Sequence, residues 1–171
     1  MSDRVLVRAL LGIAFGCLLG GCGQPPSVEL WVLAELRDDA ELSQLDFSVL
    51  DAQVQPAGFE VFADHRVSEE WLQLEIVNET IDLVAAQSEP ILVARGDVAV
   101  GDYDRVFLRP SGFTAADGQG RELVIKNVME PVGVSFSYDQ ARTLRVVLEV
   151  IAIATRGDED YSVFAKSTTV Q

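Results

Sequence analysis

The stretch TLRVVLEVIAIA, residues 143–154, is a near-continuous apolar run that contains Arg145 and Glu149. Valine and isoleucine dominate it, and their β-branched side chains favour strands. A run with so few polar residues is typical of a strand inside a sheet, so we predict a long central strand here. Residues 161–170 (YSVFAKSTTV) are predicted to be its neighbour, because residues 156–160 (RGDED) between the two patterns favour a turn.

The other strands are predicted from shorter patterns. Residues 71–77 (WLQLEIV) alternate apolar and polar side chains, which is the period of a strand with one face in water. A similar alternation runs through residues 28–36 and 45–54. Residues 123–126 and 132–138 are rich in β-branched and aromatic side chains and are also predicted strands.

Turn-forming clusters separate these strands. They stand at residues 56–58, 101–102, 110–112 and 117–120. Roughly 8 to 12 residues between turns is typical of an antiparallel sandwich or barrel. Helical patterns are short and occur at residues 37–45, 68–72 and 84–87. We therefore predict one all-β domain over residues 28–171, an antiparallel β-sandwich of about seven to nine strands.

Composition excludes several classes of protein. The 171 residues carry a formal net charge of −14, with 49% hydrophobic and 23% charged residues. These values do not fit a disordered acidic tail or a multi-span membrane protein, and the acidic balance argues against nucleic-acid binding. Residues 112–120 lack the Lys-Ser/Thr end of a phosphate loop, so no nucleotide is expected either.

The N-terminal segment is predicted to be an export signal. Arg4 and Arg8 precede an apolar run over residues 9–19, which is shorter than the roughly 20 residues that span a bilayer. The following Leu19-Gly20-Gly21-Cys22 resembles a bacterial lipobox. That resemblance implies removal of residues 1–21 and attachment of diacylglycerol to the Cys22 thiol. It also implies acylation of the new amino terminus, with palmitate-type chains.

Two alternatives stay open for this segment. Cys17 could be the lipidated residue, but it lies inside the apolar run and Phe15 is bulky for a peptidase pocket. The segment could also be an ordinary signal peptide that leaves a free thiol at Cys22.

Lipidation at Cys22 has consequences for the mature chain. Loss of residues 1–21 removes two arginines and one aspartate and changes the formal net charge from −14 to −15. No second cysteine remains for a disulfide, so packing must stabilise the domain. After Cys22, residues 23–27 form a tether with a reach of about 17 Å. The lipoprotein resemblance implies outer-membrane sorting, because residues 23 and 24 are not aspartate.

Three segments also resemble an uncharacterised family of bacterial and archaeal envelope lipoproteins, a domain of unknown function. They are residues 81–83 (IDL), 101–108 (GDYDRVFL) and 135–144 (SFSYDQARTL). The resemblance implies an immunoglobulin-like or prealbumin-like sandwich in the cell envelope, and it carries no established activity. Phe107 stands where the family has arginine, and Ser137 stands where it has aspartate.

The same segments have structural interpretations. The Tyr103 hydroxyl is expected to bond to a backbone carbonyl, in the manner of a tyrosine corner. Asp139 is expected to close a turn by accepting hydrogen bonds from backbone amides.

The sequence offers no catalytic constellation. His65 is the single histidine, and residues 133–137 (GVSFS) lack the second glycine of a serine-hydrolase elbow. One histidine and no spare cysteine cannot build a tetrahedral zinc site. We therefore expect no enzyme activity, no catalytic residue, no metal and no cofactor.

Two groups of residues are candidates for ligand binding. Trp31 shares the strand parity of Glu29 and Glu35, so its ring is expected at the surface, where it could stack on a glycan. Asp97, Asp102 and Asp104 lie in a predicted loop region where calcium could find carboxylate oxygens.

These observations leave two hypotheses for the function. The leading one is a non-enzymatic, lipid-anchored envelope protein whose sandwich is a structural or protein-interaction module with an envelope partner. The alternative is a module that binds a glycan or calcium.

Overall fold

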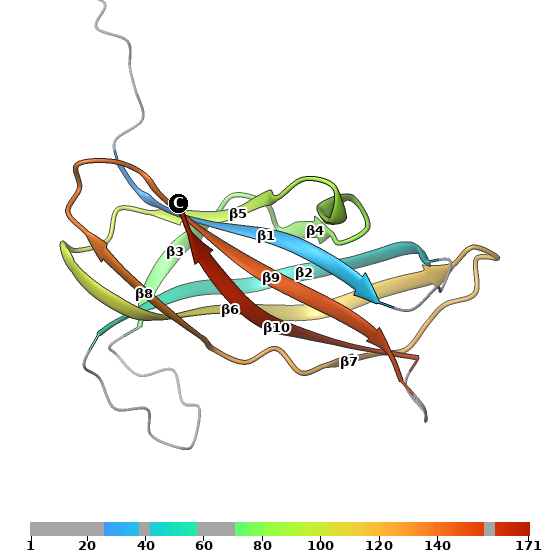
Figure 1. Cartoon of the computed structure of the whole chain (residues 1–171). Helices are drawn as coiled ribbons and strands as arrows, with labels where there is room; N and C mark the ends of the chain where they lie inside the picture. The colour runs from blue at the N-terminus through green and yellow to red at the C-terminus, as the bar shows by residue number, and fades with distance from the viewer. Residues whose placement is uncertain (1–25, 38–41, 58–70, 156–159) are drawn as a thin grey trace, which may run out of the picture.

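The computed structural model describes residues 26–37, 42–57, 71–155 and 160–171, and Cys22 and His65 lie outside them. Those residues form ten strands and one short 3-10 helix (Figure 1). The strands are β1 (Val28–Arg37), β2 (Leu42–Pro56), β3 (Leu72–Ile76), β4 (Thr80–Asp82), β5 (Ile91–Gly96), β6 (Gly101–Asp117), β7 (Ile125–Asn127), β8 (Val132–Tyr138), β9 (Leu144–Ala154) and β10 (Tyr161–Val170). The helix η1 (Ala85–Gln87) lies between β4 and β5, where one helical turn was predicted.

The strands form two packed layers, which confirms the predicted all-β sandwich. Sheet A has the order β7-β10-β9-β1-β5-β3, and sheet B has the order β3-β2-β6-β8, with β4 also paired to β2. Figure 1 shows β9 and β10 of sheet A crossing in front of β6 of sheet B. β3 takes part in both sheets, because Leu72–Leu74 pair with β2 whereas Glu75 and Ile76 pair with β5.

β9 is the long central strand that the sequence predicts. It pairs in parallel with β1 over ten residue pairs, from Val28 opposite Leu144 to Arg37 opposite Ile153. Its other edge pairs antiparallel with β10, as expected for residues 161–170. A strand with hydrogen bonds on both edges has its backbone groups satisfied, so it can be as apolar as this one.

The core lies between the two sheets. In β1 every second side chain is fully buried, at Val28, Leu30 and Val32. Sheet B contributes Phe47 and Val54 to the same cluster, which is continuous through the sandwich. Burial of a Val, Leu or Phe side chain contributes about 1.5–3 kcal/mol each, so these residues are a principal source of stability.

Four local predictions are wrong for the described residues. The turn predicted at residues 101–102 is instead the beginning of β6. Residues 110–112 do not form a turn, because they lie inside β6, where Ser111 is an extra residue between the pairs Ser48–Gly112 and Val49–Pro110. Proline has no backbone N–H to donate to the neighbouring strand. A bulge can accommodate it, because the bulge interrupts the backbone hydrogen bonds between the two strands. Residues 42–45 are strand and not helix, because pairing with β6 overrides a short helical pattern. In the helix predicted at residues 68–72, the last residue is instead the first of β3, and residues 68–70 lie outside the described part.

Two predicted turn interactions are confirmed. The Tyr103 hydroxyl donates to the Ala99 carbonyl oxygen at 2.6 Å, and its ring stacks on Phe136 with 5.0 Å between centroids. Asp139 accepts a hydrogen bond from the Ala141 amide at 2.9 Å. Both contacts fix the end of the sandwich at which β6 begins and β8 ends.

Two buried tyrosines allow a matched test of the corner. Tyr103 and Tyr138 are 2% and 1% exposed, and burial raises the pKa of both hydroxyls. Tyr103 has a backbone acceptor, whereas the Tyr138 hydroxyl has no hydrogen-bond partner among the residues that the structure describes. We predict that Tyr103→Phe lowers the free energy of unfolding by about 1 kcal/mol.

Tyr138→Phe is the control for this prediction. It removes a buried hydroxyl without a partner, so the free energy of unfolding should stay the same or rise. Urea denaturation measures both changes. Equal losses in the two variants would contradict the hydrogen-bonding role of Tyr103.

Candidate functional site

Trp31 lies on the outer face of sheet A, as its strand parity predicts, but its ring is not a free platform. The side chain is half-buried, and its indole N–H donates to Glu29 Oε2 at 2.9 Å. The guanidinium carbon of Arg145, from the neighbouring β9, lies 4.1 Å from the ring centroid. This cation–π contact covers one face of the ring, so that face is not open to a sugar.

The three candidate aspartates do not share one site. Asp97, after β5, accepts a hydrogen bond from the Gln140 side-chain amide at 2.9 Å. Asp102, in β6, accepts one from the Ser137 hydroxyl, and Asp104 is the extra residue of a bulge two positions on. Within the described ranges, no three histidine, cysteine or carboxylate side chains lie close enough together to hold a metal ion.

The outer face of sheet A is apolar at its centre. Val147 and Ile151 of β9 are 8% and 1% exposed, yet neither belongs to the core cluster between the sheets. They alternate with core residues and therefore point to the outside of the sandwich. Around them lie half-buried apolar side chains that are also outside the core cluster: Trp31, Leu33, Leu92, Ile153 and Phe164.

Charged side chains border this apolar centre. Lys166 Nζ lies 3.8 Å from Glu35 Oε2 and 3.5 Å from Glu149 Oε1, so it connects β10, β1 and β9. A hydrogen bond from the Arg37 side chain holds the pKa of Glu35 below its ordinary value. Exposed ion pairs contribute little to stability. An apolar centre inside a charged rim is, however, the arrangement found in protein–protein interfaces.

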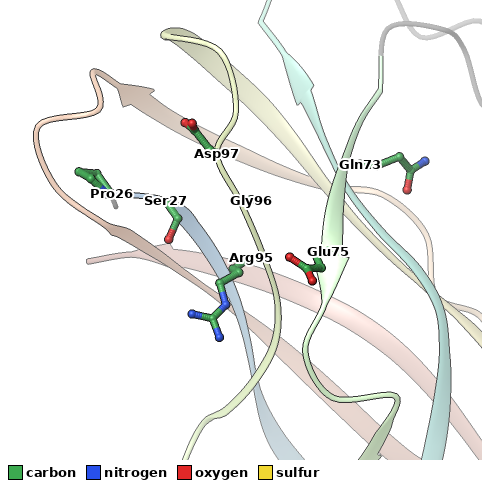
Figure 2. A pocket seen from close by; sticks show the side chains of 7 residues that line it. All are labelled: Pro26, Ser27, Gln73, Glu75, Arg95, Gly96 and Asp97. Carbon is green, nitrogen blue, oxygen red and sulfur yellow. The ribbon is translucent and has the colours of Figure 1, made fainter. Parts of the chain in front are cut away.

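A second feature was missed by sequence reasoning, a pocket at the start of β1. Figure 2 shows its lining residues, which come from the segment before β1, from β3 and from β5 with its following loop: Pro26, Ser27, Gln73, Glu75, Arg95, Gly96 and Asp97. Of these, Asp97 was a candidate, and Gln73 and Glu75 were predicted to face water. Arg95 lies in a strand that the sequence analysis did not predict.

Comparison with known proteins adds no assignment. No family model, curated protein or solved structure matches the chain. In the part of the chain that the structure describes, no helix is long and apolar enough to cross a membrane.

The contact between Arg145 and Trp31 gives a testable prediction. In a Trp71→Phe background, which leaves Trp31 as the single tryptophan, Arg145→Met should increase the quenching of its fluorescence by acrylamide, a neutral quencher that the guanidinium charge does not attract. The same substitution should lower the free energy of unfolding by about 0.5–1 kcal/mol, the contribution of an exposed cation–π pair.

Arg142→Met in the same background is the matched control. Arg142 is exposed in the turn before β9 and should change neither quantity. If acrylamide quenching were the same with and without Arg145, the guanidinium would not cover the ring in solution.

Proposed function

We propose that the chain is a non-enzymatic, lipid-anchored protein of the cell envelope, and that its sandwich is a protein-interaction module. The outer face of sheet A is the observation that carries the proposal. It combines buried and half-buried apolar side chains at its centre with a charged rim, although the core of the sandwich lies on the opposite side of the sheet.

The apolar composition of β9 supports this use of the face. A strand that packs on one side only needs apolar residues at every second position. β9 has them at nearly every position from Val146 to Ile153, including Val147 and Ile151 on the outer side. A folded partner protein that covers this face would remove the remaining apolar surface of the outer side chains from water, which favours binding.

The anchor is proposed from the lipobox at Cys22. Three acyl chains exceed the two signals that stable membrane attachment needs. The tether enters the fold at β1, which is hydrogen-bonded to β9 on one edge and to β5 on the other. A pull on the lipid would therefore act on the middle of sheet A, and the interaction face would be held near the membrane. The resemblance to envelope lipoproteins favours the outer membrane of a two-membrane bacterium.

Membrane fractionation tests the anchor. The wild-type chain should stay with the membrane pellet after a high-salt wash, because acyl chains are not displaced by salt. Cys22→Ser should move to the soluble fraction, whereas Cys17→Ser should behave as the wild type. A Cys22→Ser protein that stays in the pellet would overturn the proposed anchor.

Site-specific photo-crosslinking in intact cells tests the interaction face. A photoreactive residue at Thr169, which is exposed and pairs with Val147, should yield one dominant adduct with an envelope protein. The same residue at Ser135, exposed on the outer side of sheet B, is the control and should yield none. Adducts of equal yield at the two positions, or none at Thr169, would contradict the proposed face.

A further inference from the structure

The pocket at the start of β1 combines one guanidinium with two carboxylates. It has a volume of about 480 Å³ and lies over β5, between Ser27 on one side and Glu75 of β3 on the other. Figure 2 shows the Glu75 carboxylate directed toward the strand that carries Arg95, with Asp97 two positions further along that strand's chain. The pocket is therefore lined by groups of both charge signs.

Arg95 is available to a ligand because its side chain forms no ion pair with the described residues. It is flanked in register by Glu75 on β3 and by Glu29 on β1. Glu29 instead accepts the hydrogen bond of Trp31, whose ring lies under Arg145. Among the residues that the structure describes, neither Arg95 nor Glu75 forms an ion pair. A ligand could bind both groups without breaking an existing interaction.

We propose that this pocket binds a zwitterion that contains phosphate and ammonium groups, with the phosphate on Arg95 and the ammonium on Glu75, which is opposite Arg95 in register. A guanidinium can bind phosphate oxygens through two hydrogen bonds, and carboxylates accept hydrogen bonds from an ammonium. A simple anion would be attracted by Arg95 but repelled by the two carboxylates. A simple cation would be attracted by the two carboxylates but repelled by Arg95. Phosphoethanolamine carries one group of each sign, which matches the guanidinium of Arg95 and the carboxylate of Glu75.

The phospholipid headgroup is the source that the position of the pocket favours, and this step rests on the proposed anchor at Cys22. Pro26, in the pocket wall, is four residues after Cys22, which corresponds to at most about 13 Å of extended chain. The headgroup layer of a bilayer is itself about 5–7 Å thick on each side. The anchor would thus keep the pocket beside a high local concentration of headgroups, so a weak site would be occupied.

Phosphorus NMR on the full chain tests the proposal. The probe is glycerophosphoethanolamine, added to protein in a maltoside detergent that contains no phosphorus. We expect saturable broadening of its phosphorus signal, and binding about tenfold weaker in Arg95→Gln, the loss expected for a charge-assisted hydrogen bond. Arg121→Gln is the matched control, because Arg121 does not line the pocket and pairs with Asp117 at the C-terminal end of β6.

Two further probes test the zwitterion. Glycerol 3-phosphate lacks the ammonium and should bind about tenfold more weakly to the wild type. Glu75→Gln should weaken glycerophosphoethanolamine binding and leave glycerol 3-phosphate binding unchanged or stronger. Equal affinity for the two probes, or unchanged binding in Arg95→Gln, would overturn the proposed site.

The Cys22→Ser full chain separates this proposal from the proposed function. If the chain does not bind glycerophosphoethanolamine but Cys22→Ser loses its membrane attachment, the proposed site is overturned and the proposed anchor stands. If the chain binds the probe but Cys22→Ser stays on membranes, the ligand class is supported, and the phospholipid headgroup is overturned as the source of the ligand. Binding together with loss of attachment in Cys22→Ser would support both.

Discussion

The parallel pairing of β1 with β9 holds the centre of sheet A together. β9 is too apolar to lie at a sheet edge, and its backbone groups need partners on both sides. β1 supplies one edge over ten residue pairs and β10 supplies the other. The ends of the described chain meet at the start of the same strand, because the Leu144 amide donates to Ser27 and the Arg145 amide donates to Gln171. The first and last strands thereby hold sheet A together.

This arrangement links the proposed anchor to the proposed interaction face. The proposed tether from Cys22 would end at Ser27, whose carbonyl is hydrogen-bonded to the Leu144 amide at the start of β9. The outer side chains of β9, including Val147 and Ile151, form the centre of the face. A partner bound there would be connected to the membrane through hydrogen-bonded strands and not through a loop. That connection suits a structural role in the envelope better than a mobile binding domain would.

β3 has a comparable role for the pocket. It pairs with β2 through its first residues and with β5 through its last, so it turns from one sheet to the other. The turn brings Glu75 opposite Arg95 while Leu74 stays in the core, packed so closely against β5 that a Cβ atom on Gly96 would lie 2.9 Å from its side chain. The pocket thus follows from how the two sheets are joined at one edge.

The fold class, the central strand and the local turn contacts of Tyr103 and Asp139 could be predicted from the amino-acid sequence. These depend on periodicity and on hydrogen bonds between residues that are near in sequence, which patterns report directly. Alternation also placed Trp31 on the outside. The short strands β4 and β5 were missed, since residues 80–82 and 91–96 are too short for a clear period. The long strand β6 was not predicted as one strand, because residues 101–102 and 110–112 inside it have the composition of turns. Long-range pairing placed Arg145 over Trp31, gave Asp97 and Asp102 different hydrogen-bond partners and brought Arg95 beside Glu75. Those relations depend on strand order and register, which are set by long-range packing and leave no signal in the local pattern.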